Sequence, residues 1–203
     1  GLDYRLLTSE SAHYLIRMGM AQFNVALGNI TKNASDLLSR DSSPDHYDRL
    51  LSLFESHSVP VISYFIAGFQ GDSRESIAEN LLFFWKRTTQ IGISMFYPVP
   101  GLPGFTDYRL FETGKSVQCC GSSAFPWNNS VNTATLVTAF RLSRLINLIK
   151  SGLRNQLEEE LVLKSLTNGV LHTLVRHKKE KVIIEVPNQD VELAGLVLGS
   201  LQI

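Results

Sequence analysis

Cysteine is scarce in this sequence: among 203 residues there are two, Cys119 and Cys120, and they are neighbours. Two adjacent thiols cannot supply the spaced ligands that hold a zinc ion or an iron–sulfur cluster, and they cannot build a disulfide framework. A disulfide between them would be strained, so we expect a reducing, cytoplasmic setting. The pair is best explained as buried and structural, with an auxiliary metal site or a radical-relay thiol as the alternatives.

The sequence also has no excess of charge of one sign, because 19 basic side chains balance 19 acidic ones and the isoelectric point lies near 7.1. This balance gives no electrostatic reason to expect nucleic acid or an anionic membrane as a partner. No apolar run is long enough to cross a bilayer, and the first residues do not resemble a signal or transit peptide. A small molecule remains the expected partner. Because Gly1 opens directly onto sequence typical of a folded domain, we expect a piece of a longer protein.

The first half of the chain alternates between strand and helix patterns. Apolar residues at helical spacing, most of them behind capping residues, predict helices at 8–18, 35–39, 43–57 and 73–85. Apolar runs that end at glycine or proline predict strands at 23–27, 59–68 and 91–97. Strands separated by helical crossovers pair in parallel, so we predict an α/β fold. Three such strands leave open sheet edges, which predicts pairing with missing sequence or a homo-oligomer.

The second half is predicted to be mainly helical. Glycine, proline, serine and aromatic residues dominate 102–129, which is typical of an ordered connection. Beyond it the patterns predict helices at 132–150 and 157–177 and a strand at 182–187, while 191–201 fits either a helix or a strand. We therefore divide the chain into a βα region at 1–105, a connecting loop at 106–130 and a mainly helical region at 131–203.

The most informative segment runs from Val61 to Ser73, where a buried strand ends at Gly68 and Gly71. Glycine lets a ligand approach bare backbone, and α/β sheets place their chemistry at the carboxyl ends of parallel strands. This pattern predicts a cofactor site at that end of the sheet. The Asp72-Ser73 pair that follows is expected to cap the next helix rather than to catalyse a reaction.

Several of these segments together resemble a known family. The ordered set is Asn24-Val25-Ala26-Leu27-Gly28-Asn29, then Arg40, then Tyr64 to Ser73, then Phe96-Tyr97-Pro98-Val99-Pro100-Gly101. It is similar to the C-terminal half of a radical S-adenosylmethionine enzyme, and Gly1-Leu2 resembles the end of a preceding family strand. The resemblance covers about the first half of the chain. It implies a parallel (βα)n half or partial TIM-type barrel followed by a mainly helical C-terminal extension.

The resemblance also implies cofactors. In this family a 4Fe-4S cluster cleaves S-adenosylmethionine to a radical that takes hydrogen from a substrate, and some members also use cobalamin. The family's cluster motif, Cys-x-x-x-Cys-x-x-Cys, is absent from this sequence. We therefore expect the chain to supply part of the S-adenosylmethionine-binding wall and to be inactive by itself. The substrate stays unidentified.

The same resemblance places particular residues around the cofactor. Gly28 and Asn29 match a strand end facing the ribose or amino-acid part, and Arg40 matches an arginine that pairs with the carboxylate. Tyr64 and Ile66 match inward positions of the next strand, with Ile66 against adenine, and Gly68 shapes the loop beyond. The last strand, whose backbone can hydrogen-bond adenine, is matched by Phe96 and Tyr97.

Each of these residues also has an ordinary explanation. Arg40 beside Asp41 fits a solvated loop, the glycines fit turn geometry, and Ile66 fits a core position. The aromatic segment Phe125-Pro126-Trp127 fits either a substrate cover or a hydrophobic plug. All five histidines are isolated in the sequence and are expected at the surface rather than on a metal; they are His13, His46, His57, His172 and His177.

Two other functions remain open from the sequence. One is a non-catalytic βα interaction module that binds a partner through open sheet edges. The other is a metal-independent βα-barrel enzyme, for which acid-base residues are missing, since no lysine or glutamate stands at the carboxyl end of a predicted strand.

Overall fold

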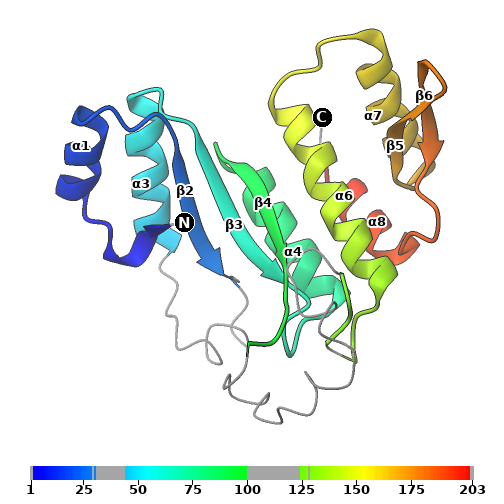
Figure 1. The fold of residues 1–203 in the computed structure, drawn as a ribbon, viewed down its shortest axis with the longest axis horizontal. Helices are drawn as coiled ribbons and strands as arrows, with labels where there is room; N and C mark the ends of the chain where they lie inside the picture. Colours follow the sequence, from blue (N-terminus) through cyan, green and yellow to red (C-terminus); the bar gives the residue numbers. More distant parts are fainter. Residues whose placement is uncertain (1, 29, 31–43, 100–123, 128, 202–203) are drawn as a thin grey trace.

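The computed structural model describes residues 2–28, 30, 44–99, 124–127 and 129–201. A four-stranded parallel sheet contains β1 (Leu2–Asp3), β2 (Phe23–Gly28), β3 (Val61–Ala67) and β4 (Gln90–Met95), side by side in that order (Figure 1). The described part also has a 3-10 helix, η1 (Tyr4–Leu6), and six α-helices: α1 (Ser9–Arg17), α3 (Pro44–Ser56), α4 (Arg74–Trp85), α6 (Thr133–Lys150), α7 (Gln156–Asn168) and α8 (Val191–Leu198). The strands β5 (His172–His177) and β6 (Glu180–Glu185) form a separate antiparallel hairpin.

The α/β class and the parallel pairing of the three predicted strands are confirmed. Each strand pairs in parallel with the next, and the short β1 adds a fourth strand that pairs Leu2 with Val25. Sequence-predicted caps also form: Thr8 caps α1, Ser73 caps α4 and Asn132 caps α6, each accepting a hydrogen bond from a backbone N–H of the first turn. The helix predicted at 35–39 and most of the predicted connection at 102–129 lie outside the described residues.

One face of the sheet packs against α3 and α4. The rings of Phe23 and Phe54 stack with centroids 3.9 Å apart, and the Phe65 ring lies 5.7 Å from that of Phe84. Burying such aromatic side chains contributes on the order of 2–3 kcal/mol each, so this contact is a main source of stability.

A chain of buried hydroxyl groups crosses this same interface. The Tyr47 hydroxyl lies 2.5 Å from Ser63 Oγ, which lies 2.8 Å from Thr89 Oγ1. Thr89 Oγ1 in turn donates to a backbone carbonyl, that of Val61 or Gln90. Burial raises the pKa of Tyr47 to about 12, although the hydrogen bonds from its neighbours oppose that rise. The hydroxyl therefore stays neutral and serves the packing of α3 on the sheet.

The free edge of β4 is covered by α6, which runs beside that strand in Figure 1. Asn147 of α6 accepts a hydrogen bond from the Ile91 N–H at 2.8 Å and donates one to the Ile91 carbonyl at 2.9 Å. A side-chain amide thus makes the two bonds that a neighbouring strand would make. In the part of the chain that the structure describes, the sheet accordingly ends at β4.

The helix predicted at 157–177 is wrong in its second half. Helix α7 ends at Asn168, because Gly169 takes a left-handed conformation with φ of 64°. The following residues, among them Thr173 and Val175, form β5, and β-branched side chains favour a strand there. The apolar spacing of this segment fits the helix repeat and the strand repeat equally well, so the sequence pattern extends the predicted helix too far.

The structure of the hairpin also corrects the predicted position of one histidine. His172 is buried at the start of β5 and its Nδ1 lies 3.1 Å from the Val170 carbonyl oxygen, so the expectation of a surface position is wrong for this residue. The predicted strand at 182–187 corresponds to β6, and the open choice at 191–201 is settled as helix α8.

Asp190 joins this C-terminal part to the rest of the fold. Its carboxylate accepts hydrogen bonds from Arg74 of α4 and Thr135 of α6, each at 2.6 Å, and from the Leu193 N–H at 3.1 Å. Burial by itself would raise the pKa of Asp190, but these hydrogen bonds outweigh burial and lower it. The ionised carboxylate therefore ties α8 to both helices. None of the helices in the described part is long and apolar enough to span a membrane.

Candidate functional site

The sheet has one covered face and one that is half exposed. Along β3 the odd-numbered residues are buried against the helices, whereas Ile62, Tyr64 and Ile66 point to the other side and are only partly buried. Parallel sheets normally have both faces covered. The half-exposed face is therefore the unusual one, and it carries two of the predicted site residues.

Tyr64 rests directly on the neighbouring strand. It pairs in register with Gly92 of β4, and a Cβ atom at Gly92 would lie 2.4 Å from the Tyr64 ring. Glycine is needed here because the ring occupies the space of a side chain. Together with Phe140 and Arg144 of α6, these residues border a hollow of about 170 Å³ on the half-exposed face.

The carboxyl ends of β2 and β3 both turn at glycine. Gly28 and Gly68 each have φ of 86°, a left-handed conformation that strains other residues. The register of β2 on β3 shifts between Ala26 and Gly28, so the regular pairing of the two strands is interrupted at the carboxyl end of β2. Gly68 is further restricted because a Cβ atom there would lie 3.0 Å from Leu136 Cδ2 of α6.

Asp72 organises the loop after β3. Its carboxylate is 2% exposed and accepts hydrogen bonds from the N–H groups of Gly68 at 2.8 Å and Phe69 at 3.1 Å. Ser73 is the cap of α4, as predicted, and forms a reciprocal capping box with Ser76. Asp72 thus holds the loop shape, a role that the sequence pattern did not distinguish from capping.

An aromatic cluster lies at the same end of the sheet. The rings of Phe69 and Phe96 meet edge to face with centroids 4.9 Å apart, and Ile66 and Trp127 pack against them. The Phe96 N–H donates to the Ala67 carbonyl at 2.8 Å, so this donor serves strand pairing rather than a ligand. Tyr97, the next residue, is 42% exposed.

The structure therefore places most of the predicted cofactor residues at one end or on one face of the sheet. Gly28, Ile66, Gly68 and Phe96 lie at the strand ends, with Tyr97 directly after Phe96, and Tyr64 lies one layer further into the half-exposed face. The predicted residues Asn29 and Arg40 lie outside the described residues, as do Cys119 and Cys120. No cluster of three or more histidine, cysteine, aspartate or glutamate side chains suited to a metal ion occurs among the residues described here.

Lys150 has a shifted pKa, and the sequence patterns did not single it out. It is the last residue of α6, and its ammonium donates to the carbonyls of Phe84 at 2.8 Å, Arg87 and Thr89. Burial lowers the pKa of Lys150 to about 8, a shift often seen in catalytic amines. Its place is the amino-terminal end of the strands, where it borders a hollow with Val61 and Gln90. That end of a βα sheet serves stability, so we assign Lys150 to holding the end of α4.

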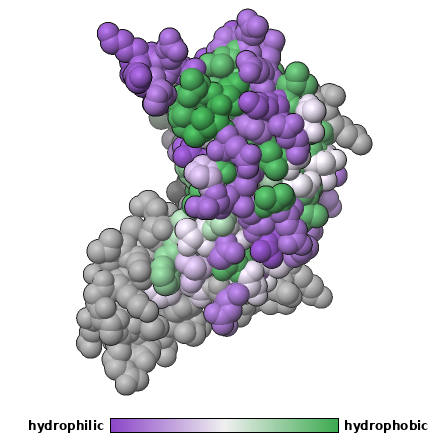
Figure 2. Space-filling view, turned by 90° about the vertical axis from the view of Figure 1, so that its right-hand side faces the viewer, coloured by the Kyte–Doolittle hydropathy of each residue, from purple (hydrophilic) through white to green (hydrophobic). Residues whose placement is uncertain are grey.

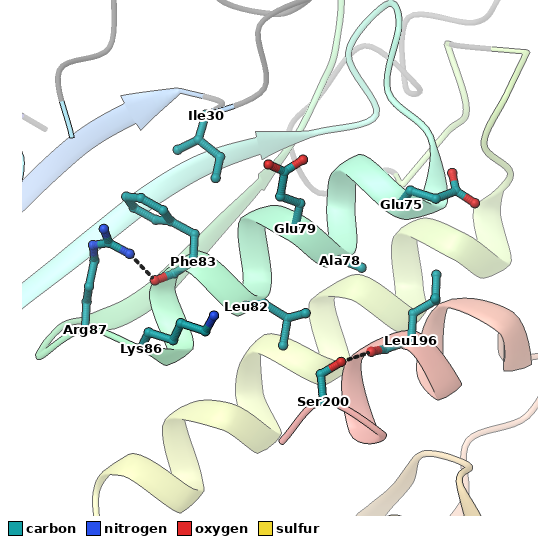
Figure 3. Close-up of a pocket in the computed structure, with 10 residues that line it drawn as sticks. All are labelled: Ile30, Glu75, Ala78, Glu79, Leu82, Phe83, Lys86, Arg87, Leu196 and Ser200. Atoms are coloured by element: carbon teal, nitrogen blue, oxygen red, sulfur yellow. Dashed lines mark hydrogen bonds between the residues drawn. The ribbon is translucent and has the colours of Figure 1, made fainter. Parts of the chain in front are cut away.

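A separate hollow of about 500 Å³ lies between α4 and α8, on the helix side of the sheet (Figure 3). Its floor is apolar, with Leu82 and Phe83 of α4 and Leu196 of α8. The charged groups on its rim do not converge on one point, and Arg87 is bound to Asp48 through two hydrogen bonds of 2.7 and 3.0 Å. None of the predicted cofactor residues borders this hollow, so the strand-end site remains the candidate.

Comparisons with known proteins add no assignment. No protein-family model matches this sequence, and no curated protein matches it significantly.

Proposed function

We propose that this chain supplies one wall of the S-adenosylmethionine pocket in a partial βα-barrel enzyme of the radical S-adenosylmethionine type. The observation that carries the proposal is the half-exposed face of the parallel sheet, which presents Tyr64 and Ile66 on one side beside the glycine turns at Gly28 and Gly68. A barrel interior is the environment that leaves one face of a parallel sheet uncovered by helices.

The end of the sheet at β4 also supports a partial barrel. Asn147 takes the place of a further strand at Ile91, and within the described residues the sheet does not continue past β4. An open barrel that stops at its last strand ends its sheet in this way. The family segments named from the sequence stand in the matching order, with the last of them beginning just after β4.

The apolar and aromatic groups at the strand ends suit an adenosyl group. Ile66 offers an apolar contact to a base, next to the rings of Phe69 and Phe96. Arg40 is proposed as the partner of the cofactor carboxylate, because a guanidinium binds carboxylates in a bidentate manner.

The iron–sulfur cluster does not fit this chain's own residues. Such a cluster needs three spaced thiolates to bind three of its irons, while the fourth iron is left for the cofactor. The sequence has only the adjacent Cys119 and Cys120. We therefore propose that the cluster ligands come from sequence preceding the chain and that the chain alone is inactive. Cobalamin remains a further candidate cofactor of the intact protein.

A non-catalytic interaction module is the second candidate. It is favoured by the outer edges of β1 and β6, with which no strand in the described ranges pairs. Binding and cleavage of S-adenosylmethionine distinguish the two functions, because only the enzyme is expected to do both.

The test is to express the full-length protein anaerobically and to reconstitute it with iron and sulfide. We expect a brown protein that cleaves S-adenosylmethionine reductively, with an upstream reading frame that carries the three spaced cysteines. A colourless protein from a complete reading frame, or one that does not bind S-adenosylmethionine, would contradict the proposal. The matched control is the 203-residue chain under the same conditions, which we expect to stay colourless.

A further inference from the structure

The hairpin of β5 and β6 has one covered edge and one open edge. On the β5 side, the His172 N–H donates to Ser165 Oγ of α7 at 3.1 Å, and α7 packs along the strand. On the β6 side, no strand of the described chain pairs with the outer edge. A two-stranded hairpin is only marginally stable by itself, so an added strand on this edge would be favourable.

The register identifies which backbone groups point outward. Val175 pairs with Val182 and His177 with Glu180, and two residues, Lys178 and Lys179, form the turn. The Val186 N–H donates across the hairpin to the Leu171 carbonyl at 2.9 Å, so even-numbered residues of this strand direct their backbone groups inward. Because the direction alternates along an antiparallel ladder, Lys181, Ile183 and Glu185 direct their N–H and C=O groups to the open edge.

The side chains of β6 also divide between two faces. Ile183 packs toward the main hydrophobic core, whereas Val182 and Ile184 project from the opposite face, where Ile184 is 39% exposed. Figure 2 views the side of the molecule that carries the hairpin and shows a hydrophobic area there, in green, next to hydrophilic side chains. The open edge is thus bordered by apolar side chains and by the charged pair Lys181 and Glu185.

We propose that the outer edge of β6 pairs antiparallel with the same edge of a second copy of this chain, with Ile183 opposite the partner's Ile183. The twofold axis then sets Lys181 opposite the partner's Glu185, and Glu185 opposite the partner's Lys181. It also sets Val182 opposite the partner's Ile184. All three outward-directed residues fall in hydrogen-bonded pairs, so one register satisfies backbone, charge and apolar contacts together.

Other registers lack this agreement. A shift of two residues that pairs Val182 with the partner's Val182 puts Glu180 opposite an isoleucine and leaves Lys181 opposite the partner's Ile183. A lysine at a sheet edge usually prevents pairing, but here Glu185 supplies its counter-charge at the matching position. The antiparallel arrangement also separates the two basic turns at Lys178 and Lys179, which lie at opposite ends of the joined sheet.

Charge reversal tests this register. We expect the 203-residue chain to pass from monomer to dimer between about 1 µM and about 1 mM in sedimentation equilibrium. Lys181→Glu and Glu185→Lys should each weaken the dimer by about tenfold or more, because each places like charges opposite one another twice. The double variant Lys181→Glu/Glu185→Lys should restore the affinity of the native chain, and Lys179→Glu, a matched charge change in the turn, should leave it unchanged.

Amide hydrogen exchange gives a second, residue-level measurement. In the dimer the amides of Lys181, Ile183 and Glu185 should exchange at least about tenfold more slowly than in dilute protein, whereas those of Val182 and Ile184 are protected at every concentration. A chain that stays monomeric, single variants that dimerise like the native chain, a double variant that does not recover, or a dimer without this alternating protection would overturn the proposal. The inference does not depend on the cofactor proposal, since neither measurement involves S-adenosylmethionine.

Discussion

The outer edge of β4 and the outer edge of β6 show two different ways to end a sheet. At β4 the amide side chain of Asn147 makes two hydrogen bonds with the backbone of Ile91, and α6 covers the strand. At β6 the backbone groups of alternate residues face outward, and no strand of the described chain meets them. The first edge is closed from within the chain, whereas the second is available to a partner.

The difference matters for both proposals, the cofactor wall on the parallel sheet and the dimer contact on the hairpin. Helix α6 closes the β4 edge, so the half-exposed face with Tyr64 and Ile66 has a border there, as the proposed partial barrel requires. The open edge of β6, where we propose the dimer contact, belongs to a hairpin outside the parallel sheet. A partner on β6 therefore leaves the strand ends at Gly28 and Gly68 accessible.

Removing the closure at β4 should have the largest effect. Asn147→Ala leaves the backbone N–H and C=O of the buried Ile91 without their partners, and we expect a loss of about 3 kcal/mol in the free energy of unfolding. Urea denaturation followed by circular dichroism measures this change. Asn168→Ala, at the exposed end of α7, is the matched control and should cost less than about 0.5 kcal/mol. Equal effects of the two substitutions would show that Asn147 does not close the edge.

Acid should weaken the hydrogen bonds by which the Asp190 carboxylate holds the C-terminal part against α4 and α6. The β6 edge belongs to this C-terminal part. The folded pKa of Asp190 is lowered, so its stabilising contribution is complete above the ordinary aspartate pKa of about 3.9 and is lost as pH falls through the folded value. Asp190→Asn should cost about 2 kcal/mol at pH 7, and this cost should shrink progressively as the pH falls below about 3.9. Urea midpoints of both proteins at several pH values measure this. A difference that stays constant down to the lowest pH would contradict the assignment.

Much of the fold follows from the sequence because its signals are local. Glycine at the ends of β2 and β3, the caps at Thr8, Ser73 and Asn132, and the alternation of helix and strand all act within a few residues. The parallel pairing then follows from the lengths of the crossovers. For the half-exposed face, the sequence predicts only that Tyr64 and Ile66 lie on the same side of one strand.

The remaining features depend on contacts between distant parts of the chain. Asn147 and Ile91 are 56 positions apart, and nothing in either local pattern predicts that a helix will complete a strand edge. Of the hairpin, only β5 is predicted wrongly, because Leu174 and Val175 fit a helix as well as a strand and the left-handed turn at Gly169 decides between them. Lys150 and Asp190 gain their shifted pKa values from tertiary burial and hydrogen bonding, which no sequence window contains.

Binding of S-adenosylhomocysteine to the full-length protein, followed by isothermal titration calorimetry, tests the central claim most directly. Ile66 and Ile62 lie on the same half-exposed face of β3, but only Ile66 lies at the carboxyl end. We predict that Ile66→Ala weakens binding about tenfold, equivalent to about 1.4 kcal/mol, and that Ile62→Ala changes it by less than about twofold. Equal effects of the two substitutions, or no binding to the native protein, would contradict the account.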